Sequence, residues 1–354
     1  MGLIRLFLAL SVIVSHNGIR VPGVEGHLAV LSFFIISGFY MGLVLNEKYV
    51  DNVKGFYLSR FLRLWPSYIV VFVILISFIE PVSHSIYVNL TATILVWMSS
   101  LFMIFSQLLW WFGINGSGAL VFLNKHAQDM NITALTNASH MQHMWSVGVE
   151  ICFYLVAPLF ARKYKTILIL MLAFTCVYVL IKEFLFFHHP LDHRSAISSF
   201  WLFLLGMTSY FIWSKFRSKL DCITLAPWVA SISGVVIITS LIALVQTDFN
   251  NPFLNIICFS FFALSIVPIF HYTRKSKIDR ALGEMSYPIY LTHWPIVAYL
   301  ITDHRGSWGW SLVIALISIF CSMILYVMVD RNVEKYRATL SKVKIKKLKP
   351  EAIK

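Results

Sequence analysis

The sequence is poor in charged residues. Only 13% of its 354 residues are Asp, Glu, Lys or Arg, about half the share of a soluble globular domain. Hydrophobic residues make up 58% of the chain, and a water-soluble fold of this length could not bury that much apolar surface. The composition excludes a soluble enzyme and predicts a multi-pass membrane protein.

The apolar segments also lack the polar alternation that the strands of a membrane β-barrel need. They run for about 20 residues, which is the length of a helix that crosses a bilayer. We therefore expect an all-α fold, a polytopic transmembrane helical bundle. The apolar runs fall at 3–19, 27–46, 64–80, 88–112, 145–161, 165–187, 196–213, 224–245, 253–272, 285–303 and 309–330.

Acidic residues are scarce as well. There are 16 Asp and Glu against 29 Lys and Arg, which gives a formal net charge of +13. The basic residues form short clusters between the apolar runs, as in the cytoplasmic loops of membrane proteins, so we expect no nucleic-acid partner. Both termini then lie in the cytoplasm. We expect a multi-pass protein of the bacterial inner (cytoplasmic) membrane, with residues 1–335 as the membrane domain and 336–354 as a basic cytoplasmic tail facing the membrane lipids.

The eleven apolar runs conflict with two cytoplasmic termini, which require an even number of crossings. The conflict lies between residues 88 and 144. The stretch WWFGINGSGAL contains three glycines and predicts a re-entrant or interfacial segment. We expect ten full crossings plus that segment, the other possibility being that 112–123 also crosses.

Cysteine pairs and a supported set of metal ligands are also missing. The five cysteines contain no C-x-x-C pair, and we interpret them as free thiols. Four residues of metal-binding types stand close together at His188, His189, Asp192 and His193, but Pro190 interrupts the group and no further ligand pattern supports it. We therefore expect no metal.

The first apolar run carries a charge and an imidazole, which are costly inside a membrane and therefore functional candidates. Arg5 and His16 are eleven residues apart, three helical turns plus about 20°, so they share one helix face about 16 Å apart. Such a pair suits a long ligand with a phosphorylated head and a reactive tail. The alternative is that Arg5 is an ordinary cytoplasmic anchor and His16 an interfacial histidine. Arg60 and Arg63 also share one helical face, and their planar guanidinium groups suit phosphate.

Five segments together resemble the acyltransferase-3 family of membrane acyltransferases, and within it the bacterial enzymes that O-acetylate lipopolysaccharide O-antigen. They occur in the order of the family and span nearly the whole chain. The segments are Arg5-x10-His16, GHLAVLSFFIISGFYMG from Gly26, SRFLRLWPSY from Ser59, MWSVGVEICFYLVAPLF from Met144 and LGEMSYPIYLTHWPI from Leu282. Many relatives carry an acidic residue where this chain has Leu31 and a second Glu where it has Ile151.

The resemblance implies an acyl-CoA donor, acetyl-CoA above all, and a hydroxyl acceptor on a glycan or lipid-linked sugar. It also implies that Arg5, Arg60 and Arg63 bind the phosphates of CoA and that His16 is catalytic. Glu150 and His293 match the glutamate after the Trp-Ser pair and the histidine of the penultimate span.

The chemistry of acyl transfer agrees with these roles. A neutral imidazole such as His16 is a suitable general base near pH 7, and a carboxylate would orient it. We expect Glu150 as that carboxylate, with Glu25 as the alternative partner. The oxyanion needs hydrogen-bond donors, for which Ser37, Ser146 and Tyr290 are candidates. Trp145 is either a sugar-stacking residue or part of an interfacial aromatic belt. The acceptor site is thus expected to include Trp145, Ser146, His293, Tyr290 and Glu25.

Two other functions remain open from the sequence. A proton-coupled transporter could use Arg5, His16 and Glu150 as a proton or substrate path, but transporters usually have related halves and none are apparent in this chain. The same acyl transfer could also have a small lipid or a secondary metabolite as its acceptor.

Overall fold

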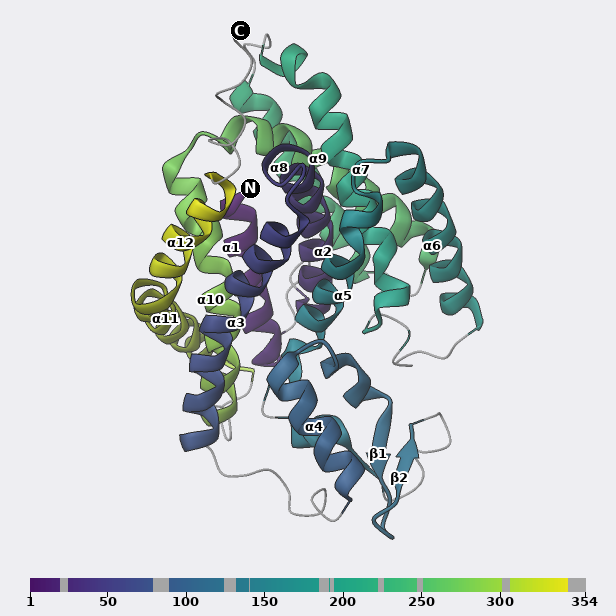
Figure 1. Cartoon of the computed structure of the whole chain (residues 1–354), viewed down its shortest axis with the longest axis vertical. Helices are drawn as coiled ribbons and strands as arrows, with labels where there is room; N and C mark the ends of the chain where they lie inside the picture. The colour runs from purple at the N-terminus through teal and green to yellow at the C-terminus, as the bar shows by residue number, and fades with distance from the viewer. Residues whose placement is uncertain are drawn as a thin grey trace, which may run out of the picture.

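The structure is a computed structural model. It describes residues 1–19, 25–78, 89–123, 132–139, 141–184, 191, 194–221, 226–246, 251–300 and 306–342. In these ranges the chain is mainly helical (Figure 1). The α-helices are α1 (Gly2–His16), α2 (Gly26–Leu43), α3 (Val53–Phe78), α4 (Leu90–Phe102), α5 (Trp145–Phe160), α6 (Tyr164–Phe184), α7 (Ala196–Asp221), α8 (Ala226–Gln246), α9 (Pro252–Thr273), α10 (Lys277–Leu300), α11 (Trp308–Leu325) and α12 (Arg331–Lys342).

Eight helical runs within the described residues are long and apolar enough to cross a membrane. They contain α2, α3, α5, α6, α7, α8, α9 and the continuous run from α11 into α12. This confirms a helical membrane protein. The ten crossings and the cytoplasmic termini stay predictions.

The segment after residue 88 differs from a membrane span. Helix α4 has 13 residues, about 20 Å at 1.5 Å per residue, which is shorter than the roughly 30 Å hydrocarbon core. The chain then forms a small antiparallel sheet in the order β2-β1-β3, from β1 (Phe112–Ile114), β2 (Leu120–Phe122) and β3 (Thr133–Ala134). The sheet and α4 lie at one end of the molecule (Figure 1). The mainly helical fold that was expected is confirmed, and this small sheet is an addition to it.

The turn between β1 and β2 explains why the apolar run breaks there. The side-chain oxygen of Asn115 accepts hydrogen bonds from the backbone N–H groups of Ser117 and Ala119, at 3.2 and 2.9 Å. Gly118 has φ +81°, a left-handed conformation that glycine adopts without steric cost. An Asn side chain that satisfies the backbone in this way competes with helix formation.

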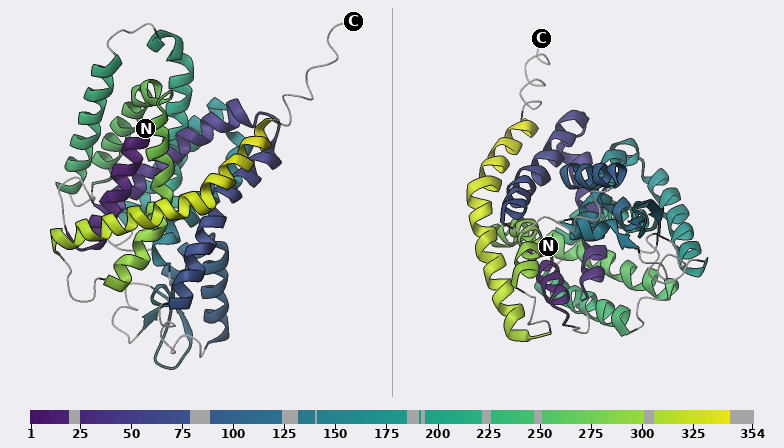
Figure 2. Two further views of the ribbon diagram at one scale, coloured as in Figure 1. Left: turned by 90° about the vertical axis from the view of Figure 1, so that its left-hand side faces the viewer. Right: turned by 90° about the horizontal axis from the view of Figure 1, so that it is seen from below.

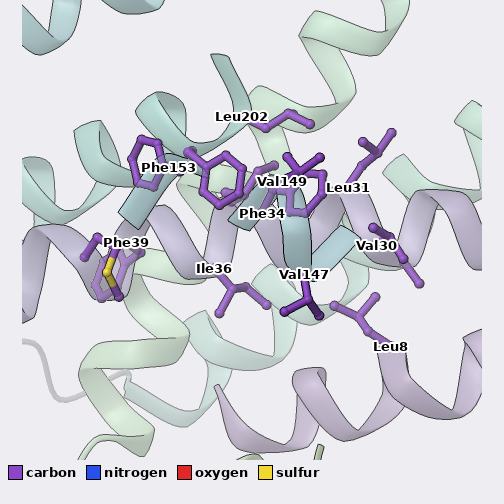
Figure 3. Packing of buried hydrophobic residues seen from close by; sticks show 14 of the residues in the cluster. Leu8, Val30, Leu31, Phe34, Ile36, Phe39, Val147, Val149, Phe153 and Leu202 are labelled. Atoms are coloured by element: carbon purple, nitrogen blue, oxygen red, sulfur yellow. The ribbon is translucent and has the colours of Figure 1, made fainter. Parts of the chain in front are cut away.

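Helices α2 and α7 pack closely against each other. A Cβ atom on Gly38 of α2 would lie 1.9 Å from the backbone oxygen of Phe203, and one on Gly206 of α7 would lie 1.9 Å from that of Ile35. The two backbones therefore touch. The Phe34 and Phe153 rings stack on the two sides of Phe203, with centroid distances of 4.7 and 4.4 Å, and Figure 3 shows Phe34 and Phe153 in this part of the core.

Both ends of α1 are tied to neighbouring helices, and this positions Arg5 and His16. At the first turn, the Asp279 carboxylate of α10 accepts hydrogen bonds from the backbone N–H groups of Gly2 and Leu3, at 2.9 and 3.0 Å. A carboxylate at a helix N-terminus satisfies donors that lack intrahelical partners. Just past the other end, the Asn17 amide donates to the backbone oxygen of Ser307 and the hydroxyl of Ser311. Helix α1 thus has a fixed position along α10 and α11.

Helix α12 runs across residue 335, the expected end of the membrane domain. It follows α11 through a π-helical turn, η7 (Tyr326–Asp330), and the three form one curved rod on the outside of the bundle (Figure 2). Arg337 is 7% exposed and its Nε–H donates to the Ser59 hydroxyl of α3 at 3.2 Å. Part of the expected tail therefore packs on the bundle, and residues 343–354 lie outside the described residues.

Candidate active site

A cavity with about 730 Å³ of empty space opens between α1, α2, α3, α5 and α10. Arg5, Arg60 and Arg63 all line it, so residues from two helices that are distant in sequence meet there, as the resemblance implied. Arg60 is only 7% exposed, and its buried Nε atom has no hydrogen-bond partner.

The charges in this cavity are unbalanced. Three guanidinium groups line it, and Glu150 is the one acidic side chain among its described lining residues. One oxygen of that carboxylate accepts hydrogen bonds from the hydroxyls of Ser37 and Tyr154. A buried cation without a full set of partners is costly. The cavity is therefore suited to an anionic ligand, and guanidinium groups bind phosphate well.

The position of Glu150 corrects one expectation. A carboxylate was expected beside His16, but Glu150 lies in the arginine cavity and is held by Ser37 and Tyr154. The partner of His16 is His293 of α10, with 2.9 Å between Nδ1 of His16 and Nε2 of His293. The alternative carboxylate, Glu25, lies 3.2 Å from Nδ1 of His27.

The hydrogen bonds of the two histidines define which nitrogen of each ring carries a proton. Nδ1 of His293 lies 2.7 Å from the backbone oxygen of Tyr290, which can only accept, so this Nδ1 carries hydrogen. In a neutral ring the Nε2 of His293 is then an acceptor, and Nδ1 of His16 must donate to it. This leaves the lone pair of His16 on Nε2. Since His293 is fully buried, it holds the His16 ring in the tautomer that a general base at Nε2 requires.

A third imidazole, His143, completes this group and was not singled out from the sequence. It precedes α5 in a 3₁₀ turn, η6 (Gln142–Met144). Its ring lies 5.2 Å from that of His293 and stacks on Trp294 at 5.6 Å. The ring of His16 also contacts Trp294, edge to face at 5.2 Å. The one sequence feature that could have pointed to His143 was its position directly before the segment that begins at Met144. A position in the sequence does not show that the ring contacts α10.

Ser146 and Tyr290 lie where the cavity meets the histidines. Both line the cavity, and their hydroxyl oxygens are 2.7 Å apart. The Tyr290 hydroxyl donates to the backbone oxygen of His143 at 2.7 Å, and the Ser146 hydroxyl lies 3.2 Å from the same oxygen. The cavity with the arginines and the histidine group are therefore adjacent, and their shared wall is a hydroxyl pair.

Trp145 lies in the core of the bundle. It is 8% exposed and packs edge-on against Phe34, with 6.5 Å between ring centroids. It belongs to the main hydrophobic core. Its ring is therefore mostly covered by neighbouring side chains in this structure.

The four residues noted as metal-binding types, His188, His189, Asp192 and His193, lie outside the described residues. Among the described residues, no group of three His, Cys, Asp or Glu side chains is arranged to hold a metal ion.

The sequence profile of the acyltransferase-3 family, described as an acyltransferase domain, matches residues 1–327. The chain belongs to this family. It is similar to O-acetyltransferase OatA of Staphylococcus aureus strains NCTC 8325 and COL, with 23% identity over 322 residues, which is 84% of this chain and 50% of the relative. Another protein of Staphylococcus aureus strain COL, provisionally named an O-acetyltransferase, is 24% identical over 340 residues with the same coverage. This acyltransferase-3 chain spans about half the length of these curated relatives. No solved structure matches it.

Proposed function

We propose that this acyltransferase-3 protein is a membrane O-acetyltransferase that moves acetyl from cytoplasmic acetyl-CoA to a hydroxyl group. The observation that carries the donor assignment is the cavity with three guanidinium groups and one carboxylate. CoA carries a diphosphate and a third phosphate group, so its head matches this excess of positive charge. Arg60 supports the assignment because it is buried with an unpaired Nε–H.

The distance between the two ends of α1 suits the length of the donor. Arg5 and His16 are eleven residues apart on one helix, which is about 16 Å at 1.5 Å per residue. With its phosphates at the arginines, CoA would extend its pantetheine arm along the cavity toward Ser146 and Tyr290. The thioester would then lie next to the histidine group, where a base is available.

In this proposal His16 starts the reaction. Its Nε2 takes the proton of the acceptor hydroxyl as the oxygen attacks the thioester carbonyl, and a bond forms between that oxygen and the acetyl carbon. His293 accepts the Nδ1–H of His16 and keeps the ring in place. When the tetrahedral intermediate collapses, the carbon–sulfur bond breaks and the sulfur takes the proton from His16. The products are the acetyl ester and free CoA.

The acceptor we propose is a hydroxyl of a cell-surface glycan or lipid-linked sugar. The resemblance to enzymes that modify lipopolysaccharide O-antigen supports a glycan, and the relatives named O-acetyltransferase support an O-acetyl product. We place the protein in the bacterial inner (cytoplasmic) membrane, with the arginine end of the cavity toward the cytoplasm, where acetyl-CoA is made.

The test is CoA binding by the purified protein and its arginine variants. Removal of a charged hydrogen-bond partner costs about 1.5–3 kcal/mol. Arg60→Gln is therefore expected to weaken CoA binding about tenfold or more, and Arg60→Lys less, since lysine keeps the charge but not the planar fork. The matched control is Arg162→Gln, because Arg162 is a half-exposed arginine that pairs with Asp51 outside this cavity.

Two outcomes would contradict the donor assignment. One is wild-type protein that neither binds CoA nor releases CoA from acetyl-CoA, which would favour a transporter. The other is unchanged CoA affinity in Arg5→Gln, Arg60→Gln and Arg63→Gln, which would make these arginines membrane anchors.

A further inference from the structure

His143 is a buried imidazole whose two ring nitrogens both lack hydrogen-bond partners. It is 4% exposed, and within the described residues neither Nδ1 nor Nε2 makes a hydrogen bond of normal geometry. A neutral imidazole has one donor and one acceptor, and buried polar groups of native proteins are nearly always satisfied. A buried group left without a partner therefore needs an explanation, and a substrate that binds there is one.

The surroundings hold this ring firmly, beside the histidine that pairs with the proposed base. Its backbone oxygen accepts the Tyr290 hydroxyl hydrogen at 2.7 Å, its ring stacks on Trp294, and its ring meets His293 at 74°. His293 in turn holds His16. His143 is thus a rigid group that shares two neighbours with the proposed base.

The other candidates for stabilising the oxyanion already donate their hydrogens to acceptors within the protein. The Ser37 hydroxyl donates to Glu150, and the Tyr290 hydroxyl donates to the backbone of His143. The Ser146 hydroxyl is left with the backbone oxygen of His143 or the oxygen of Tyr290 as its acceptor. The His293 Nδ1–H donates to the Tyr290 backbone. Among these groups, the N–H of His143 is the donor that makes no hydrogen bond of normal geometry within the described residues.

We propose that His143 is a catalytic residue whose ring N–H donates to the thioester oxygen as it becomes an oxyanion. This rests on the proposed acyl transfer. As the acceptor oxygen attacks, the π electrons of the carbonyl move onto its oxygen, and the His143 N–H stabilises that charge without giving up its proton. The acceptor proton goes to His16. When the carbonyl re-forms, the carbon–sulfur bond breaks, and the carbonyl oxygen loses its negative charge and with it the strong hydrogen bond from His143.

The decisive variant is His143→Phe in the purified full-length protein, with release of CoA from acetyl-CoA as the readout. Phenylalanine keeps an aromatic ring against Trp294 and removes both nitrogens. Loss of one oxyanion donor typically lowers turnover about 10²–10³-fold, and we expect that loss here with unchanged CoA affinity. The melting temperature should stay equal or rise, because apolar atoms replace nitrogens that had no partners.

Two further variants separate a donor from other roles. His143→Gln keeps an N–H donor without a titratable ring, so it should retain at least tenfold more turnover than His143→Phe. If the larger ring prevents folding, His143→Leu removes the nitrogens with less volume. Tyr272→Phe is the matched control, since it deletes a buried polar atom that has no partner within the described residues and lies away from the cavity lining, and its turnover should stay normal.

Each outcome decides the proposal. Normal turnover in a folded His143→Phe or His143→Leu protein would overturn it. Equal loss in His143→Gln and His143→Phe would also overturn the donor role and indicate proton transfer. If the wild-type protein releases CoA from acetyl-CoA and His143→Phe does so at the normal rate, this inference is refuted but the proposed function is not. A wild-type protein with no acetyl-CoA turnover refutes the proposed function as well.

Discussion

The pairing of His16 with His293 leads to a quantitative prediction about turnover. His16→Ala removes the proposed base, and positioned acid–base catalysis is typically worth about 10²–10⁴-fold. His293→Phe leaves the base in place but removes the acceptor of its Nδ1–H, a hydrogen bond of 2.9 Å to a fully buried ring. A buried donor without a partner costs about 1–3 kcal/mol, so His293→Phe should lower turnover about 5- to 150-fold.

The two substitutions should not be additive. Once His16 is alanine, His293 has no ring to hold, so the double variant should be about as slow as His16→Ala alone. Acetyl-CoA turnover is measured by the thiol released, and CoA affinity is measured separately. Affinity should change little in all three proteins, because His16 lies about 16 Å from Arg5 along α1.

The control for this series is His27→Gln. His27 lies near Glu25 at the start of α2 and does not line the cavity, so its turnover should be normal. Near-normal turnover in His16→Ala would refute the assignment of the base. Equal losses of CoA affinity and turnover in His16→Ala would make it a donor-site residue, and full additivity with His293→Phe would refute the pair.

Three further predictions concern the scaffold and the orientation. Gly38→Ala should lower the free energy of unfolding by about 1–3 kcal/mol or more, measured as a lower melting temperature, since its Cβ would lie 1.9 Å from a facing backbone oxygen; an unchanged melting temperature would contradict the contact of α2 with α7. Asp279→Ala should cost about 0.5–2 kcal/mol by uncapping α1 and should weaken CoA binding by displacing the first turn; equal CoA affinity would argue against this link. In a variant without native cysteines, Lys54→Cys and Arg217→Cys should react only with cytoplasmic thiol reagents and Asn131→Cys, outside the described residues, only with external ones; external labelling at residue 54 would reverse the orientation.

Much of the membrane architecture follows from the sequence, because the lipid bilayer imposes it. A chain with 13% charged residues and apolar runs of helical length must satisfy its backbone inside each segment, and helices do so locally. The same local geometry places Arg5 and His16 at the two ends of one helix, and α1 (Gly2–His16) has that form. Spacing along a helix was therefore sufficient to predict that these two residues lie at the two ends of α1.

Partners between helices depended on the tertiary structure. The sequence predicted a carboxylate for His16, but the orientation of α5 turns Glu150 toward Ser37 and Tyr154, and α10 brings His293 to His16 instead. The Asn115 turn and the sheet of β1 to β3 likewise rest on side-chain-to-backbone bonds that hydropathy does not detect.

His143 shows most clearly what only the tertiary structure decided. Its role is invisible in the sequence because a histidine before an apolar helix is an ordinary residue. It becomes a candidate once the fold buries both ring nitrogens without partners beside His293 and Trp294. Which helix faces meet, and therefore which polar atoms remain unpaired, is set by the packing of all the helices together, and no local sequence pattern contains that information.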